Sequence, residues 1–342
     1  AGTYYLWTKV TDVAGNRASS IIVSNAFVIG NYTITITASP TGWTNGNVTG
    51  TITYASVLSQ NRKAGYGTSL SAAQSSATAT TATTLTKTAT ANGYFYAEAT
   101  DTMGNKVTKS LQVTNIDKSA PTVKLSVNGG TFAKPTSGNA TIKTTLTASD
   151  TGGSGLKTLQ YAWSTSGTTQ PSSWTTFTNG ATVSTSRGVG TYYLWTNVTD
   201  NAGNRASSIK VSSAFKVVTS SITITPSPTA WTNGNVTATI TYSSALTSNK
   251  KAGVGSTLAN ATNAASTSTA TKVTVTTNNY YIYAEATDSM GNKVTASRKI
   301  TNIDKKAPTV SLSVNGGTFA KPTSGNATIK TTLTASDTGG SG

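Results

Sequence analysis

A long internal repeat constrains the fold of this chain more than any other feature. The segment TYYLWT at Thr3 recurs at Thr191, and the Asp-x-x-Gly-Asn sequence at Asp12 recurs at Asp200, in both cases 188 residues later. A fixed period of this kind is typical of an array of like units, each packing mainly against its neighbours. We therefore expect tandem modules rather than one large globular domain.

Each period contains two related halves. The segment Gly93–Asn105 (GYFYAEATDTMGN) has the same layout as Thr191–Asn204 (TYYLWTNVTDNAGN), so two module types, A and B, alternate. The predicted modules are 1–30 (C-terminal part of an A), 31–117 (B), 118–218 (A), 219–304 (B) and 305–342 (N-terminal part of an A). Because the outer two match only parts of a module, we expect the sequence to be a window on a longer tandem polypeptide.

Period-2 alternation predicts β-strands throughout. Segments such as Val48–Tyr54 (VTGTITY) alternate β-branched apolar residues with Thr, which is typical of half-buried antiparallel strands. Asn-Gly pairs, as at Asn128 and Asn315, mark turns between them. No long helical period appears, and the Ala/Ser-rich stretch 69–81 is predicted to be loop and short strand. About seven strands per module favour an all-β chain of immunoglobulin-like sandwiches.

Four motifs carry a resemblance to a known family. They are APTV at Ala120 and Ala307, SPTxWTNGNVT at Ser39 and Ser227, ASDTGGSGLK at Ala148, and GTYYLWTNVTDNAGN at Gly190. This combination resembles the tandem bacterial immunoglobulin-like repeats of large cell-surface and adhesin proteins, especially those of Gram-positive bacteria. The resemblance implies tandem sandwiches in an extended rod, located outside the cell at the bacterial surface. It also implies that the stretch ending in Asp-x-x-Gly-Asn is the penultimate strand with its hairpin.

That register predicts which side chains of the strand face the core. In type A these are Tyr192, Leu194, Thr196 and Val198, and in type B they are Phe95, Ala97 and Ala99. The opposite face would carry Tyr193, Trp195 and Asn197 in type A and Tyr94, Tyr96 and Glu98 in type B, with Tyr281 and Tyr283 in the second B. Such exposed aromatic side chains are candidate contacts for sugars or proteins. The alternative is that they pack under a neighbouring loop or an adjacent chain.

Composition excludes most catalytic chemistry. The chain has no His and no Cys, so it offers no imidazole base, no thiol nucleophile and no disulfide. Its ten acidic residues form no close pair in the sequence, and the abundant Ser and Thr lack a base partner. We expect no enzyme, no catalytic residues and no cofactor-binding residues.

Calcium and a covalent crosslink are the two remaining kinds of site. Calcium prefers clustered carboxylates, whereas each Asp here is isolated in sequence and is explained as a turn or cap residue; Asp117 and Asp150 are the strongest of the weak metal candidates. A lysine–asparagine isopeptide bond occurs in related Gram-positive domains and needs a buried lysine beside an acid. Glu98 or Glu285 could supply the acid, with Lys106 or Lys293 on the following strand.

The net charge of +16 comes from scarce acids rather than from a basic block. Dispersed lysines do not predict specific nucleic-acid binding, although a net positive charge attracts anionic polysaccharides or an acidic host surface at long range. No apolar run approaches 18 residues, so membrane insertion is not expected.

Short connectors indicate a mechanical role. Only a few residues join the last strand of one module to the first strand of the next, as in TNIDKSAPTV from Thr114 to Val123, and Pro121 restricts the backbone there. We expect a structural shaft or stalk segment of an extracellular fibre or adhesin, whose partners are its own neighbouring repeats or identical chains. The alternatives are a multivalent array that binds polysaccharide or anionic polymers, and a filament subunit that self-assembles laterally.

Overall fold

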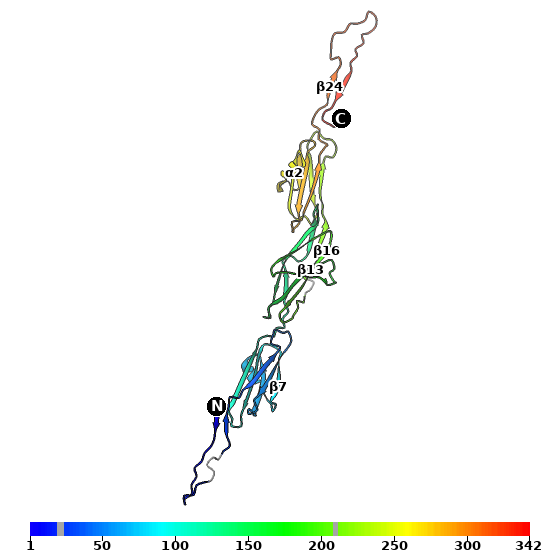
Figure 1. The fold of residues 1–342 in the computed structure, drawn as a ribbon. Helices are drawn as coiled ribbons and strands as arrows, with labels where there is room; N and C mark the ends of the chain where they lie inside the picture. The colour runs from blue at the N-terminus through cyan, green and yellow to red at the C-terminus, as the bar shows by residue number, and fades with distance from the viewer. Residues whose placement is uncertain (19–23, 208–210) are drawn as a thin grey trace. The chain divides into compact units, whose positions relative to one another are not determined.

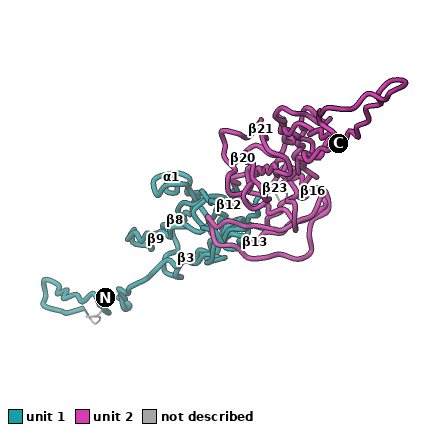
Figure 2. Tube along the Cα trace, turned by 90° about the horizontal axis from the view of Figure 1, so that it is seen from above, with its two compact units in different colours: residues 1–123, 148–159, 197–207 teal, residues 124–147, 160–196, 208–342 magenta. Residues whose placement is uncertain are grey.

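The computed structural model describes residues 1–18, 24–207 and 211–342. The predicted modules 1–30 and 118–218 each include a few residues outside these ranges. Contacts divide the chain into two units, coloured separately in Figure 2. Unit 1 holds 1–123, 148–159 and 197–207, and unit 2 holds 124–147, 160–196 and 208–342. The boundary falls within 118–218, so the predicted module bounds stay predictions.

The strands of 31–117 form two facing sheets in unit 1. They are β3 (Ile34–Ser39), β4 (Val48–Tyr54), β5 (Gln60–Gly67), β6 (Thr78–Ala79), β7 (Thr84–Ala89), β8 (Gly93–Thr100) and β9 (Lys106–Val113). One sheet has the order β3-β4-β7 and the other β6-β5-β8-β9. Figure 1 labels β7, a strand of the first sheet. This split of first, second and fifth strands from the rest is that of an immunoglobulin-like sandwich.

Alternation places the core between the two sheets. In β4 every second residue is buried, and Ile52 pairs with Ile36 of β3 in antiparallel register. Phe95 from β8 is fully buried opposite Gly50 of β4, where a Cβ would come within 2.7 Å of the phenyl ring. The predicted core residues Phe95, Ala97 and Ala99 all have 1% exposure or less. Large side chains of one sheet therefore fill space left by small residues of the other.

The stretch 69–81 contains a helix that the sequence did not predict. Helix α1 (Leu70–Ser75) begins at Ser69, whose hydroxyl accepts a hydrogen bond from the amide of Ala72 at 3.1 Å, and the short strand β6 follows. A cap of this kind satisfies one of the free amides at a helix start. The helix lies directly on β5, because a Cβ at Gly65 would come within 2.3 Å of the Ala73 carbonyl oxygen. Six residues are too few to show a helical period.

The strands of 219–304, in unit 2, repeat this arrangement. They are β18 (Ile222–Ser227), β19 (Val236–Tyr242), β20 (Ser248–Gly255), β21 (Lys272–Val275), β22 (Tyr281–Thr287) and β23 (Lys293–Lys299), with helices α2 (Leu258–Asn263) and η1 (Thr267–Thr269). The sheets are β18-β19-β21 and β20-β22-β23, and their facing sides enclose a second apolar core. Thr257 caps α2 as Ser69 caps α1. The two B modules thus share the added helix.

The strands of 118–218 form a sandwich with a larger second sheet. They are β10 (Thr122–Leu125), β11 (Gly130–Lys134), β12 (Ala140–Ser149), β13 (Leu156–Ser164), β14 (Thr175–Thr176), β15 (Thr182–Arg187), β16 (Gly190–Asp200) and β17 (Phe215–Thr219). The sheets are β10-β12-β15 and β11-β17-β16-β13-β14, with β11 parallel to β17. The rings of Phe132 and Trp163 both contact Phe215, with centroids 5.9 and 5.1 Å away. The chain is therefore all-β, with tandem immunoglobulin-like sandwiches, as predicted.

Two short hairpins account for the rest of the described strands. They are β1 (Gly2–Tyr4) with β2 (Phe27–Ile29), and β24 (Thr309–Leu312) with β25 (Leu333–Ser336). Their large apolar residues are exposed, as Trp7 and Phe319 show at 60% and 46%. No helix among the described residues is long and apolar enough to cross a membrane.

The contact between α1 and β5 leads to a stability prediction. We expect Gly65→Ala to lower the free energy of unfolding by about 1–3 kcal/mol, because its Cβ would clash with the backbone of the helix. The matched control is Gly42→Ala, since no atom lies within 4 Å of a Cβ at that position, and its effect should stay within about 0.5 kcal/mol. Urea unfolding measures both, and equal effects would contradict the packing described here.

Candidate functional site

The connector after β9 is tied to the module that precedes it. Thr44 and Ile116 form an isolated parallel bridge, in which the amide of Asp117 donates to the carbonyl of Thr44 at 2.9 Å. The side chain of Asn92 holds Ile116 on both sides, accepting from its amide and donating to its carbonyl. The backbone that leaves the sandwich therefore has a fixed direction as far as Asp117.

Loops of the following module bind the same connector. The amide of Ser154 donates to Asp117 Oδ2 at 3.0 Å, and Asn204 Nδ2 donates to the Asp117 carbonyl at 2.9 Å. The amide of Asn45 donates to the carbonyl of Ala202 at 3.1 Å. Gly152 lies so close to Asp117 that a Cβ there would come within 1.8 Å of Oδ1. Both the β12–β13 loop and the turn after β16 thus pack around one aspartate, and all of these residues belong to unit 1.

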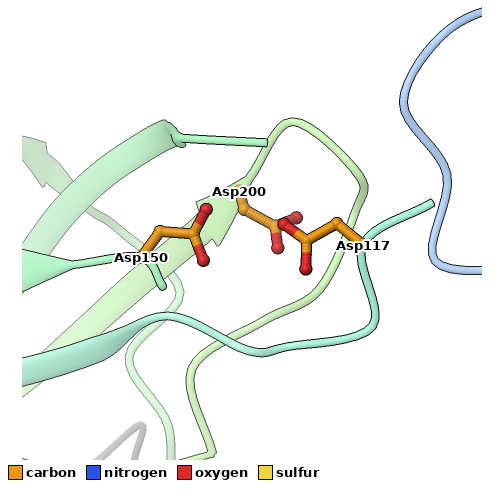
Figure 3. Close-up of side chains that lie close together, drawn as sticks. All are labelled: Asp117, Asp150 and Asp200. Atoms are coloured by element: carbon orange, nitrogen blue, oxygen red, sulfur yellow. The ribbon is translucent and has the colours of Figure 1, made fainter. Parts of the chain in front are cut away.

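Three carboxylates meet at this point. One oxygen from each of Asp117, Asp150 and Asp200 lies within 4.8 Å of the other two, and Figure 3 shows the three side chains directed toward one another. Asp117 and Asp200 are buried, with 2% and 0% exposure, and Asp150 is half-buried. Among the described residues, no lysine or arginine forms an ion pair with any of the three.

Local turns fix each carboxylate separately. Asp150 accepts from the amides of Gly152 and Gly155, and Asp200 accepts from the amide and the side-chain nitrogen of Asn204. These are the turn roles that the sequence predicts. Although these aspartates are far apart in the sequence, the fold brings the two weak metal candidates Asp117 and Asp150 together with Asp200. The sequence could not show this, because it depends on the connector, the β12–β13 loop and the turn after β16 sharing one end of the sandwich.

The electrostatics favour an ionised Asp117. Burial alone would raise the pKa of its carboxyl, but the Ser154 hydroxyl and the amides of Ser119 and Ser154 outweigh it and lower the pKa below its ordinary value. The Ser154 side chain, at 7% exposure, is buried beside this carboxyl group and helps to keep it ionised.

The connector of the second B module, in unit 2, repeats part of this site. Thr232 bridges Ile303, the amide of Asp304 donates to Thr232, and the amide of Ser341 donates to Asp304 Oδ2 at 3.0 Å. A hollow of about 360 Å³ lies beside it, lined by Trp231, Asp304 and Ser341 among others. Asp337 takes the position of Asp150 in this copy and accepts from the amide of Gly339.

The Asp-x-x-Gly-Asn turn after β22 contacts the A module that precedes it, and all residues involved lie in unit 2. Asp288 Oδ2 accepts from the amide of Ala133 at 2.8 Å, and Asn292 exchanges two hydrogen bonds with the backbone of Thr141. The amide of Thr295 also donates to the Thr136 hydroxyl oxygen at 2.8 Å. The same turn motif therefore binds a preceding module in both module types.

The prediction of exposed aromatic residues is wrong for three of the six. Tyr96, Tyr283 and Trp195 do lie on the predicted outer face, but their exposures are only 6%, 8% and 6%. Helices α1 and α2 lie over the outer faces of β5–β8 and β20–β22, and Trp195 Nε1 donates to the carbonyl of Ser166 in the β13–β14 loop. Non-local segments thus cover these rings, as the alternative prediction had it.

The other three aromatic residues, Tyr94, Tyr193 and Tyr281, are half-buried. The Lys299 ammonium lies 5.6 Å from the ring centroid of Tyr281. The predicted core positions Tyr192, Leu194, Thr196 and Val198 all have 8% exposure or less, which confirms the register of β16. Whether the half-buried tyrosines contact a ligand stays a prediction.

The predicted crosslinking acids take part in ion pairs instead. Glu98 lies between Lys63 and Lys106, whose Nζ atoms are 3.6 and 2.5 Å from its oxygens, and the Tyr96 hydroxyl donates to it at 2.8 Å. Glu285 repeats this arrangement with Lys251, Lys293 and Tyr283. Because the Lys106 and Lys293 side chains are 54% and 51% exposed, the buried lysine that an isopeptide bond needs is not provided.

These contacts shift two kinds of pKa. The hydrogen bond from Lys106, helped by that from Tyr96, lowers the pKa of Glu98 despite its burial. Burial and the bond to Glu98 raise the pKa of Tyr96 to about 12. At neutral pH Glu98 is therefore an ionised carboxylate and Tyr96 a neutral phenol. The hydrogen bond and ion pairs between these groups stabilise the fold.

Comparisons with known proteins add little to this description. No protein-family model and no curated protein matches the chain. Two solved structures of marsupial T cell receptor are similar to it, at 12% and 14% identity. They cover 78% and 79% of this chain and 99% of their own, with TM-scores of 0.27 and 0.20. Scores this low carry no argument, so the immunoglobulin-like assignment rests on the strand order.

The lowered pKa of Glu98 predicts a pH-dependent mutational effect. The ionised carboxylate stabilises the fold above its unfolded pKa, and this contribution is lost as the pH falls through the folded pKa. We expect Glu98→Gln to lower the free energy of unfolding by about 1 kcal/mol at neutral pH and to have almost no effect once the carboxyl is protonated. Urea unfolding across the acid range measures this, and a pH-independent difference would contradict it.

The contact at Thr141 predicts different roles for two equivalent asparagines. Asn105 bonds only within its own turn, whereas Asn292 also bonds Thr141. We expect Asn292→Ala to cost about 1–3 kcal/mol more than Asn105→Ala, because it leaves backbone groups of Thr141 without partners. Hydrogen exchange at the Thr141 amide should accelerate only in Asn292→Ala. Equal exchange in both variants would exclude the contact.

Proposed function

We propose that this chain is a shaft segment of a bacterial extracellular fibre or surface adhesin, in which tandem modules turn repeated sequence into length. One observation carries the proposal. In the modules 118–218 and 219–304, the Asp-x-x-Gly-Asn turn is hydrogen-bonded to the module that precedes it. Asn204 donates to the Asp117 carbonyl, and Asn292 exchanges two hydrogen bonds with the backbone of Thr141. The connectors have only a few residues, and these hydrogen bonds restrain the modules further.

The anchoring of the connectors supports the same conclusion. Both B-to-A connectors are bridged to their own B module, through Thr44 with Ile116 and Thr232 with Ile303. A shaft under tension benefits from hydrogen bonds on both sides of each connector, because bending then requires several of them to break together. A flexible array would instead need solvated Gly/Ser linkers. The partners of such a shaft are its own neighbouring repeats, and its place is the outside of the cell.

The absence of catalysis belongs to this proposal. Among the described residues, the only group of three or more converging acidic side chains is that of Asp117, Asp150 and Asp200, and the chain has no histidine to act as a base. The alternatives of a polysaccharide-binding array and of lateral assembly stay predictions. The polysaccharide-binding array was predicted from the exposed aromatic residues together with the dispersed lysines, and lateral assembly from the same aromatic faces. Of the six aromatic residues, Tyr96, Tyr283 and Trp195 are buried.

A linker insertion tests the shaft. We expect six Gly/Ser residues inserted between Ser119 and Ala120 to broaden the distance distribution between spin labels placed on the modules either side. The same insertion between Ser172 and Ser173, which are exposed in the β13–β14 loop, should leave it unchanged. Pulsed electron resonance measures the distribution. A distribution equally broad in the unmodified chain would show freely jointed modules and overturn the proposal.

A further inference from the structure

We propose that the module 31–117 binds an extended acidic peptide segment of another protein, which adds as a strand along the free edge of β9. The bound segment carries an apolar side chain and, two residues away, a carboxylate. The inference concerns residues of unit 1 alone and goes beyond the shaft proposal. Its failure would leave that proposal standing, because the linker insertion tests the shaft without any ligand.

The edge of β9 is open to a further strand. In the module 118–218, β11 pairs with the last strand, β17, from Gly130 to Lys134. The counterpart in 31–117 is one isolated bridge, between Thr44 and Ile116, which lies beyond the end of β9. Among the strands that the structure describes, β9 itself pairs only with β8. A strand edge of this kind presents backbone N–H and C=O groups that another chain can join.

A hollow between β9 and β3 can receive a side chain of the added strand. It has a volume of about 430 Å³, and its lining includes Ile36, Ala38, Pro40, Leu111 and Val113. Leu111 and Ala38 are half-buried at the surface of the core. Asn115 fixes one end, since its side-chain amide donates to the carbonyls of Pro40 and Gly42 at 3.0 and 2.6 Å. An apolar side chain placed here would remove apolar surface from water.

The charge beside the hollow favours an acidic peptide. Lys109 lies two residues before Leu111 on β9, so both side chains are on the same face of the strand. Lys109 is exposed and forms no ion pair with any acid that the structure describes. A bound strand with its apolar side chain at Leu111 therefore places the side chain two residues away beside this ammonium group.

The acidic strand comes from a different protein. Both glutamates of this chain lie in central strands, β8 and β22, where lysines pair with them. Its aspartates lie at turns and connectors. A second copy of the chain thus has no acidic edge strand to offer, whereas its net charge of +16 attracts acidic partners at long range.

The second B module, in unit 2, differs at both of these positions. Arg298 of β23 takes the position of Leu111, and its Nη1 donates to the carbonyl of Ile224 in β18 at 3.4 Å. This side chain reaches across the place that is open in 31–117. Ala296 takes the position of Lys109. The module 219–304 is therefore an internal control, in which neither the apolar contact nor the ammonium group is provided.

A labelled peptide tests the site on the full chain. The probe is a fluorescent peptide TTTETVTTT, and its control is TTTKTVTTT. We expect saturable binding of the first by fluorescence anisotropy, and about 5-fold weaker binding of the second. Lys109→Glu should reverse this preference. Hydrogen exchange should slow on binding at the amides of β9 and stay unchanged at β7, an edge strand of the other sheet.

Two further variants separate binding from folding. Leu111→Arg installs the residue of the second B module and should weaken binding by about 10-fold, with circular dichroism as the check on folding. Ala296→Lys combined with Arg298→Leu transplants the site and should raise the number of peptides bound per chain from one to two. The proposal is overturned if the unmodified chain shows no saturable binding, if Leu111→Arg binds as tightly, if Lys109→Glu still prefers the glutamate peptide, or if the double variant still binds one peptide.

Discussion

Backbone pairing between a connector and the module it leaves is the interaction on which the rest of this structure depends. Thr44 holds Ile116 and Asp117 as a short parallel strand, and Thr232 holds Ile303 and Asp304 in the same way. Because parallel pairing fixes position and direction together, it delivers one carboxylate to one place at the end of the sandwich. The loops that bind Asp117 could not do so if the connector were free to swing.

One turn motif serves different purposes in different surroundings. In all four Asp-x-x-Gly-Asn turns the aspartate accepts from the asparagine four residues on, so the hairpin closes in the same way at Asp12, Asp101, Asp200 and Asp288. At Asp12 and Asp101 the turn is exposed, whereas at Asp200 and Asp288 it is buried against another module. The motif thus closes its own turn, and its remaining amide and carboxylate groups form hydrogen bonds with a neighbouring module where one is in contact.

The sequence predicts those features that arise from local periodicity. Alternation gave the strands and the buried faces of β8 and β16, because period 2 reports directly which side is apolar. It could not decide whether Tyr96 and Trp195 are exposed or covered, since the covering segments, α1 and the β13–β14 loop, lie elsewhere in the chain. It missed α1 because six residues are shorter than two helical turns. It separated Asp117, Asp150 and Asp200 because their convergence depends on which loops share an end of the sandwich.

The cluster formed by Asp117, Asp150 and Asp200 is unexpected in a chain with a net charge of +16. The chain has 26 basic and 10 acidic residues, so basic partners outnumber the carboxylates. Each of the two glutamates forms ion pairs with two lysines. Asp117, Asp150 and Asp200 nevertheless meet without an ion pair to any lysine or arginine that the structure describes. A lysine there would require its long side chain to enter a space bounded by Gly152 and Ser154, where even a Cβ on Gly152 clashes with Asp117. Hydrogen bonds from neighbouring backbone amides, such as those of Gly152 to Asp150 and of Ser154 to Asp117, therefore take the place of an ammonium group.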